Sequence, residues 1–331
     1  MERFALAAAV VLGFALTAAL CSLFVPLRRV LERREQTQQP AQSEQPRPAP
    51  LRAPLWGGLC AAAGTVAAVG VGWLAACVGQ PELLGSEGRL MTRLLTALAG
   101  SLAFGAVGLA EDLARMRSPA ALGLRRDVRL LLEALAAAFV LLLLQAAGCL
   151  PRGLDVPGAG YVLLGSAVPF LWAVLMVALA ECARIAERDE GTVCGAAFVA
   201  MLALMMAEAG LGVPGLAVLP AALAGALVAL LLWAFPPARL GVGCCGSLLA
   251  AGAIGCIPLS LDMTSLTVPL ALPFWAAGGL LAAQLLGAKR TGKPLRCWVK
   301  KHKMSPETVF LCSFALSAVG YVLALALLRW C

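Results

Sequence analysis

The chain has 331 residues, of which 61% are hydrophobic and only 13% are charged, and its mean hydropathy is +0.89. A soluble globular domain is about half apolar and about a quarter charged, so this composition excludes an ordinary soluble enzyme or binding domain. The formal net charge of +8 is not concentrated in a compact basic domain, and we therefore expect no nucleic-acid partner. The composition is instead typical of a protein embedded in a membrane.

Long apolar runs recur along the whole chain. A helix needs about 20 apolar residues to cross the hydrocarbon core, and only helices or closed barrels satisfy their backbone groups there. The runs show no alternation with a period of two residues, which argues against a barrel. They predict an all-α polytopic membrane protein with about ten transmembrane helices and both termini outside. The predicted spans are residues 4–27, 55–79, 91–110, 130–149, 159–180, 192–209, 213–234, 244–261, 267–288 and 308–328.

Basic residues are distributed unequally between the two sides that these spans define. Of the 26 Lys and Arg residues, 21 fall on one side. Loops rich in Lys and Arg face the cytoplasm, so this side is predicted to be cytoplasmic. The first span carries its cluster of arginines after the apolar stretch, whereas a signal peptide carries its positive charge before it. We therefore interpret the first run as a retained span whose N-terminus lies outside.

The connection between the first two spans differs in composition from the rest of the chain. Residues 35–54 are rich in Gln and Pro and lack apolar periodicity, which predicts a disordered cytoplasmic loop. The outer loops are short and no soluble domain is evident, so residues 1–331 are predicted to form a single transmembrane domain. Any active site must then be built from the cytoplasmic loops and the ends of the spans.

Acidic residues gather in two places on the predicted cytoplasmic side. Glu111 and Asp112 stand together where the third span ends. The loop after the fifth span is crowded with four more, namely Glu181, Glu187, Asp189 and Glu190. Ionisable groups at the ends of spans often mark functional sites. Two such clusters on one face are able to hold Mg²⁺, which binds one or two carboxylates together with substrate phosphates. The alternative interpretation is that these charges end the helices and pair with neighbouring arginines.

Five short segments, in order along the chain, carry motifs at these same loops. They are APLWGGL at 53–59, GLAEDLAR at 108–115, ECARIAERDEGTVCG at 181–195, residues 237–247, and KRTGK with a following His at 289–302. They resemble TPTMGG, GxxDDxxK, NAVNLTDGLDGLAxG, PAxxFMGDTGS, and KxTGK with the first His of a three-His motif. These are motifs of the polyprenyl-phosphate N-acetylhexosamine-1-phosphate transferases, among which the phospho-N-acetylmuramoyl-pentapeptide transferases are the branch that the chain resembles most.

The resemblance implies transfer of a sugar-1-phosphate from a UDP-sugar to undecaprenyl phosphate, with release of UMP, in the bacterial cytoplasmic membrane. It also implies Mg²⁺ as cofactor, polyprenyl phosphate and a UDP-sugar as partners, and a homodimer as an assembly to be tested. By motif position, the implied catalytic residues are Glu111, Asp112, Glu187, Glu190 and His302, with Glu111, Asp112 and Glu187 as metal ligands. The implied substrate-binding residues are Arg115, Arg129, Arg184, Ser247 and Lys293.

Several motif positions depart from the family pattern. Glu111 replaces the first Asp of an Asp pair, Cys244 replaces the Asp of the fourth motif, and Lys303 follows the single His of the chain. A neutral thiol removes a carboxylate charge outright, and a Glu in place of Asp adds a methylene group. Two hypotheses therefore stay open: a diverged but active transferase, and a catalytically inactive paralogue that binds lipid or a partner cell-wall enzyme as a regulator or scaffold. An unrelated transporter is a third hypothesis, supported only by the number of spans.

Overall fold

Long helices form most of this computed structural model. It describes residues 2–38, 56–79, 88–117, 123–151, 153–156, 160–163, 165–187, 191–212, 215–235, 238–287 and 305–328. The long helices are α1 (Glu2–Gln38), α2 (Gly57–Gly79), α4 (Gly88–Arg117), α5 (Arg126–Ala146), α6 (Val168–Ala186), α7 (Thr192–Gly210), α8 (Val218–Ala234), α9 (Gly243–Ser260), α11 (Leu272–Gly287) and α13 (Pro306–Leu328). The shorter elements are β1 (Gly153–Val156), β2 (Gly160–Leu163), η1 (Gly165–Ala167), η2 (Thr264–Leu266) and α10 (Thr267–Leu270).

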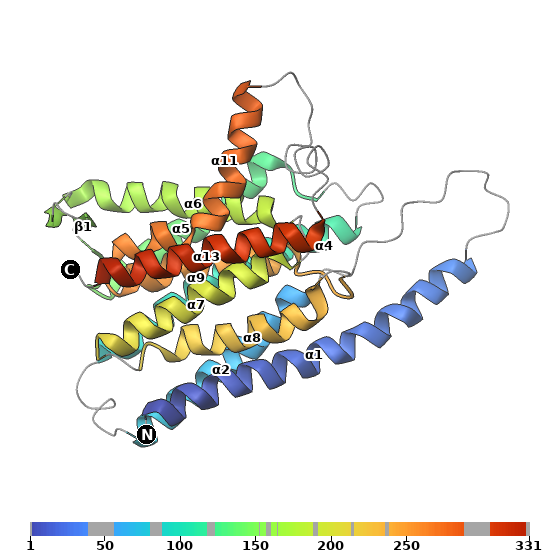
Figure 1. The fold of residues 1–331 in the computed structure, drawn as a ribbon, viewed down its shortest axis with the longest axis horizontal. Helices are drawn as coiled ribbons and strands as arrows, with labels where there is room; N and C mark the ends of the chain where they lie inside the picture. The colour runs from blue at the N-terminus through green and yellow to red at the C-terminus, as the bar shows by residue number, and fades with distance from the viewer. Residues whose placement is uncertain are drawn as a thin grey trace.

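Seven of the described helices, namely α1, α2, α4, α6, α7, α9 and α13, are long and apolar enough to cross a membrane. Helix α8 is also apolar but has only 17 residues. Every predicted span overlaps a helix, so the prediction of an all-α polytopic membrane protein is confirmed. Helix α1 begins and α13 ends at the same end of the bundle (Figure 1). The number of ten crossings and the outside location of the termini stay predictions.

The connection between α5 and α6 differs from its prediction. The span predicted at 159–180 begins only at Val168, because residues 160–163 pair with β1 in an antiparallel hairpin. Aromatic and β-branched residues in that segment favour a strand. Pro169 lies in the first turn of α6, where its missing N–H group removes no helical hydrogen bond.

The loop predicted at 35–54 also begins too early. Helix α1 continues to Gln38, because the Leu, Arg and Glu residues that precede this point have high helix propensity. Residues 39–54 carry the rest of the predicted loop and lie outside the described chain.

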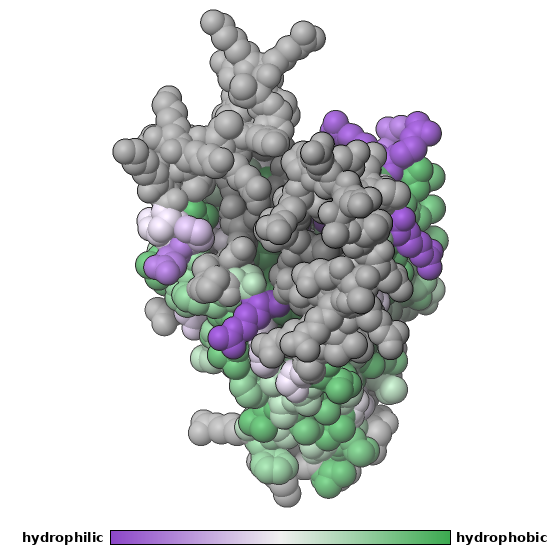
Figure 2. Space-filling view, turned by 90° about the vertical axis from the view of Figure 1, so that its right-hand side faces the viewer, coloured by the Kyte–Doolittle hydropathy of each residue, from purple (hydrophilic) through white to green (hydrophobic). Residues whose placement is uncertain are grey.

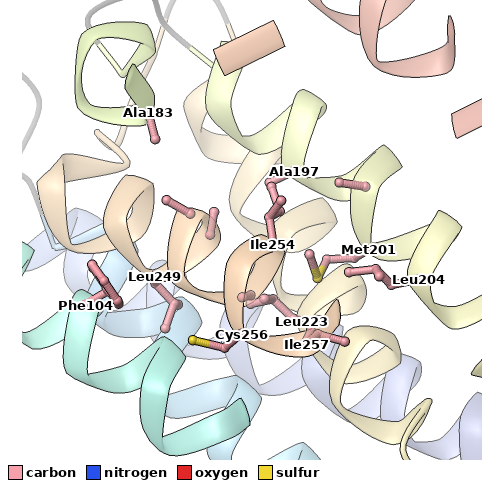
Figure 3. Packing of buried hydrophobic residues seen from close by; sticks show 14 of the residues in the cluster. Phe104, Ala183, Ala197, Met201, Leu204, Leu223, Leu249, Ile254, Cys256 and Ile257 are labelled. Carbon is pink, nitrogen blue, oxygen red and sulfur yellow. The ribbon is translucent and has the colours of Figure 1, made fainter. Parts of the chain in front are cut away.

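Helix α9 lies at the centre of the bundle. All 18 of its residues are buried, and it packs against α2, α4, α6 and α7. In Figure 3, Leu249, Ile254 and Cys256 of α9 lie among core side chains that include Phe104 of α4 and Met201 of α7. Helix α1 packs against α2 and α8 at one edge, and α11 runs across the direction of the other helices (Figure 1).

Small residues let two helices approach the first turn of α9 closely. A Cβ atom added at Gly108 of α4 would overlap the carbonyl group of Cys244, and one at Gly58 of α2 would overlap the backbone of Gly246. Helices in lipid associate largely through such close van der Waals packing. Figure 2 looks onto this end of the molecule, where patches of hydrophilic residues contrast with a hydrophobic lower part. Gly108 lies three residues before Glu111 on α4, so the close packing lies beside predicted site residues.

Candidate active site

The ends of four helices meet at one place in the bundle. Helix α4 ends at Arg117, α5 begins at Arg126, α6 ends at Ala186 and α9 begins at Gly243. Helix α4 packs against α5 and α9, and α6 packs against the same two helices. Motifs that are far apart in the sequence are therefore neighbours in space.

Asp112, near the end of α4, forms hydrogen bonds with the start of α9. Its side chain is buried, and its Oδ1 accepts a hydrogen bond from the backbone N–H of Cys244 at 3.0 Å while Oδ2 accepts one from Cys245 at 2.9 Å. The first N–H groups of a helix lack partners within it and carry partial positive charge, so a carboxylate is favourable there. Gly243, whose φ is +71°, turns the chain into α9. Both oxygens of Asp112 are thus engaged by the backbone.

Glu111 and Arg115 form an ion pair beside Asp112. They lie four residues apart, a spacing that places both side chains on one face of a helix, and Arg115 Nη2 donates to Glu111 Oε1 at 2.6 Å. Arg115 Nη1 is also 3.8 Å from Asp112 Oδ1. The second oxygen of Glu111, Oε2, is buried and has no hydrogen-bond partner among the described atoms. The alternative interpretation, in which terminal carboxylates pair with neighbouring arginines, is confirmed for this pair.

Arg129 connects three helices through its guanidinium group. Its Nε donates to Glu181 Oε1 of α6 at 2.8 Å, and its Nη1 is 3.6 Å from Glu111 Oε1 of α4. Nε is also 3.9 Å from Glu133 Oε1, one turn further along α5. Pairing of this kind is what allows charged groups to be buried. Arg129, predicted to bind substrate, therefore lies among carboxylates of the protein itself.

Two carboxylates of this network received no role from motif position, although the sequence had already placed Glu181 in an acidic cluster. Glu181 accepts hydrogen bonds from Arg129 and Arg184, and Glu133 is fully buried with no side-chain hydrogen bond among the described residues. Glu133 lies inside the apolar run predicted at 130–149 and outside every motif. The signal that identifies it is its charge, because an ionisable residue within a span usually faces the bundle interior and serves function.

Arg184 and Glu187 lie at the end of α6, beside the charged residues of α4 and α5. Arg184 pairs with Glu181, and its Nε is buried without a hydrogen-bond partner in the described part of the chain. Glu187 directly follows the last residue of α6, and its carboxylate interacts electrostatically with Asp112 and Arg115. The structure thus brings together charged residues that the sequence placed in separate motifs.

The remaining predicted site residues contribute less to the described geometry. Ser247 is fully buried, and its hydroxyl donates to the carbonyl oxygen of Cys244 at 3.1 Å within the first turn of α9. The hydroxyl hydrogen of Ser247 is therefore already engaged in a hydrogen bond within the protein. Glu190, Lys293 and His302 lie outside the described residues, and their roles stay predictions.

Two of the predicted metal ligands, Glu111 and Asp112, already make contacts within the protein. Mg²⁺ needs oxygen ligands in a nearly octahedral arrangement, but both oxygens of Asp112 accept backbone hydrogen bonds and one oxygen of Glu111 is bonded to Arg115. Cys244 offers sulfur, which suits softer metals. Among the described residues, no three or more Asp, Glu, His or Cys side chains are placed to hold a metal ion. A carboxylate oxygen has two lone pairs, so one accepted hydrogen bond leaves it able to bind a cation. The metal-binding role of Glu111, Asp112 and Glu187 stays a prediction.

Comparison with known proteins gives the chain a family. The model of glycosyl transferase family 4 matches residues 94–262, which include every described site residue. The chain is 28% identical over 265 residues to phospho-N-acetylmuramoyl-pentapeptide-transferase of Mycobacterium tuberculosis, covering 72% of each chain. It is 30% identical over 212 residues to the protein of that name from Synechococcus sp. (63% of this chain, 55% of the relative), and 32% identical over 170 residues to that of Desulforudis audaxviator (48% and 50%). Because the family model covers half of the chain, including the ends of α4, α5, α6 and α9, this protein belongs to glycosyl transferase family 4.

Proposed function

We propose that this chain transfers a sugar-1-phosphate from a UDP-sugar to a polyprenyl phosphate, with release of UMP, at the cytoplasmic face of a bacterial cytoplasmic membrane. The observation that carries the proposal is the meeting of two charged motifs near the start of α9, represented by Asp112 and Arg115 of one and Arg184 of the other. Relatives at 28% and 32% identity are named for the transfer of phospho-N-acetylmuramoyl-pentapeptide. The apolar helices that surround the site support a lipid as the acceptor.

The proposed reaction replaces one phosphate linkage by another. A phosphate oxygen of the lipid attacks the β-phosphorus of the UDP-sugar, the bond from that phosphorus to the bridging oxygen breaks, and UMP leaves. Transfers of this kind depend on positioning and on stabilisation of charge over the phosphate oxygens.

Two arginines are suited to bind the diphosphate. Guanidinium groups bind phosphates through paired N–H donors, and Arg184 has a buried Nε donor without a partner in the described chain. The Arg115 side chain is 23% exposed and lies beside Asp112. In this arrangement Arg115 and Arg184 contact the substrate, while Asp112 holds the start of α9 in place.

A second candidate function is that of a catalytically inactive relative that binds the lipid or a partner enzyme. Two observations favour it. Asp112 uses both oxygens on backbone amides, and Cys244 stands where the family motif has Asp. In this candidate the charged network preserves the fold of the family while turnover is lost.

Release of UMP by the purified full-length protein in detergent distinguishes the two functions. The reaction contains undecaprenyl phosphate and either UDP-N-acetylmuramoyl-pentapeptide or UDP-N-acetylglucosamine, with and without Mg²⁺. The proposal predicts release that falls at least about tenfold in Asp112→Asn, because one amide N–H of α9 then faces a nitrogen and the helix start is displaced. Asp127→Asn, whose side chain is 84% exposed on α5, is the matched control and keeps its activity. No release from either donor by a folded protein contradicts the proposal and supports the inactive relative.

A further inference from the structure

Glu133 is a fully buried carboxylate beside the site, and no family motif contains it. Its exposed fraction is 0%, and neither oxygen has a hydrogen-bond partner in the described chain. A carboxylate removed from water is costly unless it is paired, and an ionisable residue inside a membrane bundle is usually retained for function. Its ion-pair partner is Arg129, whose Nε lies 3.9 Å from Oε1.

Arg129 is held by carboxylates on two sides. Its Nε faces Glu133 of the same helix and Glu181 of α6, while Nη1 faces Glu111 of α4. Because Glu133 follows Arg129 by four residues, helix α5 alone sets their relative position. Glu133 therefore orients the guanidinium group to which carboxylates from the two other helices bind.

Glu111 continues these contacts toward the start of α9. Its Oε1, which faces Arg129, also accepts the 2.6 Å hydrogen bond from Arg115. Arg115 in turn lies 3.8 Å from Asp112, which bonds the first amides of α9. A continuous series of polar contacts thus joins Glu133 on α5 to the start of α9.

We infer that Glu133 is a positioning residue for this site, which acts through Arg129 and does not contact substrate. The inference rests on the proposed transferase function and extends it, since it also changes the role of Arg129 from binding substrate to ordering α4 and α6. Only 8% of the Arg129 side chain is exposed, compared with 12% for Arg184 and 23% for Arg115. The two more exposed arginines remain the groups that bind the diphosphate.

Kinetics of Glu133→Gln test the inference, because this change keeps the size of the side chain and removes its charge. We expect kcat for UMP release to fall about tenfold as the charged groups move, and KM for the UDP-sugar to stay within about twofold. Glu133→Asp keeps the charge and is expected to recover part of kcat. Asp127→Asn, an exposed carboxylate on the same helix, is expected to change neither constant. An unchanged kcat in Glu133→Gln, a rise in KM alone, or no recovery in Glu133→Asp overturns the inference.

A double-mutant cycle on stability needs no turnover and separates this inference from the transferase proposal. The Tm shifts of Glu133→Gln and Glu111→Gln, measured singly and together in detergent, are expected not to add, because both side chains face Arg129. The shifts of Glu133→Gln and Asp127→Asn are expected to add. Additive shifts for Glu133 and Glu111 overturn the inference. Non-additive shifts without any UMP release contradict the transferase proposal alone.

Discussion

At the junction of α4 with α9, the carboxylate of Asp112 bonds backbone amides, and Gly108 lets the two helices touch. At the junction of α4 with α5 and α6, side-chain ion pairs surround Arg129. The first junction depends on backbone atoms, which cannot rotate away from an added group. The second depends on long side chains that are buried or partly buried, and each has a partner of opposite charge. We therefore expect the first junction to be sensitive to shape and the second to charge.

The largest effect is expected at the charged junction. Arg129→Gln leaves the buried Glu133 without its cationic partner, while Glu111 and Glu181 keep Arg115 and Arg184. Removal of one partner from a buried ion pair costs about 3–5 kcal/mol. The measurement is the free energy of unfolding in mixed detergent and SDS micelles. Arg125→Gln, one turn earlier and 85% exposed, is the control and is expected to change stability by less than about 0.5 kcal/mol. Equal, small effects in both variants would show that the cluster contributes little to stability.

A smaller effect is expected at the junction of α4 with α9, where the close approach of the helices leaves no room for a larger side chain. Gly108→Ala places a methyl group against the carbonyl of Cys244, and overpacking of this kind costs about 1–3 kcal/mol. Gly70→Ala on α2 is the matched control, because nothing lies within 4 Å of the added Cβ there. Alanine has the higher helix propensity, so the control is expected to be as stable as the wild type or more stable. If both variants unfold alike, close approach of α4 to α9 is not required.

Asp112→Asn tests the hydrogen bonds at the start of α9 separately from catalysis. Loss of a side-chain cap typically costs about 1 kcal/mol, with an upper range near 2 kcal/mol. Amide hydrogen exchange measured by mass spectrometry is expected to speed up for the first turn of α9, at Cys244 and Cys245, with little change in the middle of the helix. Unchanged exchange in the first turn would contradict the role assigned to Asp112.

The smallest effect is expected for Ser247→Ala. The hydroxyl of Ser247 is already bonded to a carbonyl of its own helix, and a bond of this local type contributes less than about 1 kcal/mol. KM for the UDP-sugar should therefore stay within about twofold of the wild type. A tenfold rise in KM would instead support the substrate-binding role that the motif implies.

The sequence predicted the helices well because lipid requires long, internally bonded apolar segments. It misplaced the start of α6, since the strand at 160–163 is as apolar as a span. The sequence predicted that Glu111 and Asp112 lie at the end of a span, on the same side of the membrane as the other motifs. It did not predict that Asp112 binds backbone amides, because side-chain types do not reveal which N–H groups lack partners. Glu133 was missed because it lies within an apolar run and in none of the motifs, although its spacing of four residues from Arg129 on one helix favours contact between the two side chains.

The lipid product is the most direct test of whether the charges at the start of α9 form a working transferase site. The purified full-length protein is incubated with undecaprenyl phosphate and each UDP-sugar, and the lipid fraction is analysed by mass spectrometry. Transferase function predicts a polyprenyl diphosphate-linked sugar in the same amount as the UMP released, and about tenfold less of it from Asp112→Asn. A folded wild-type protein that yields no lipid-linked sugar from either donor would contradict transferase function and indicate the inactive relative.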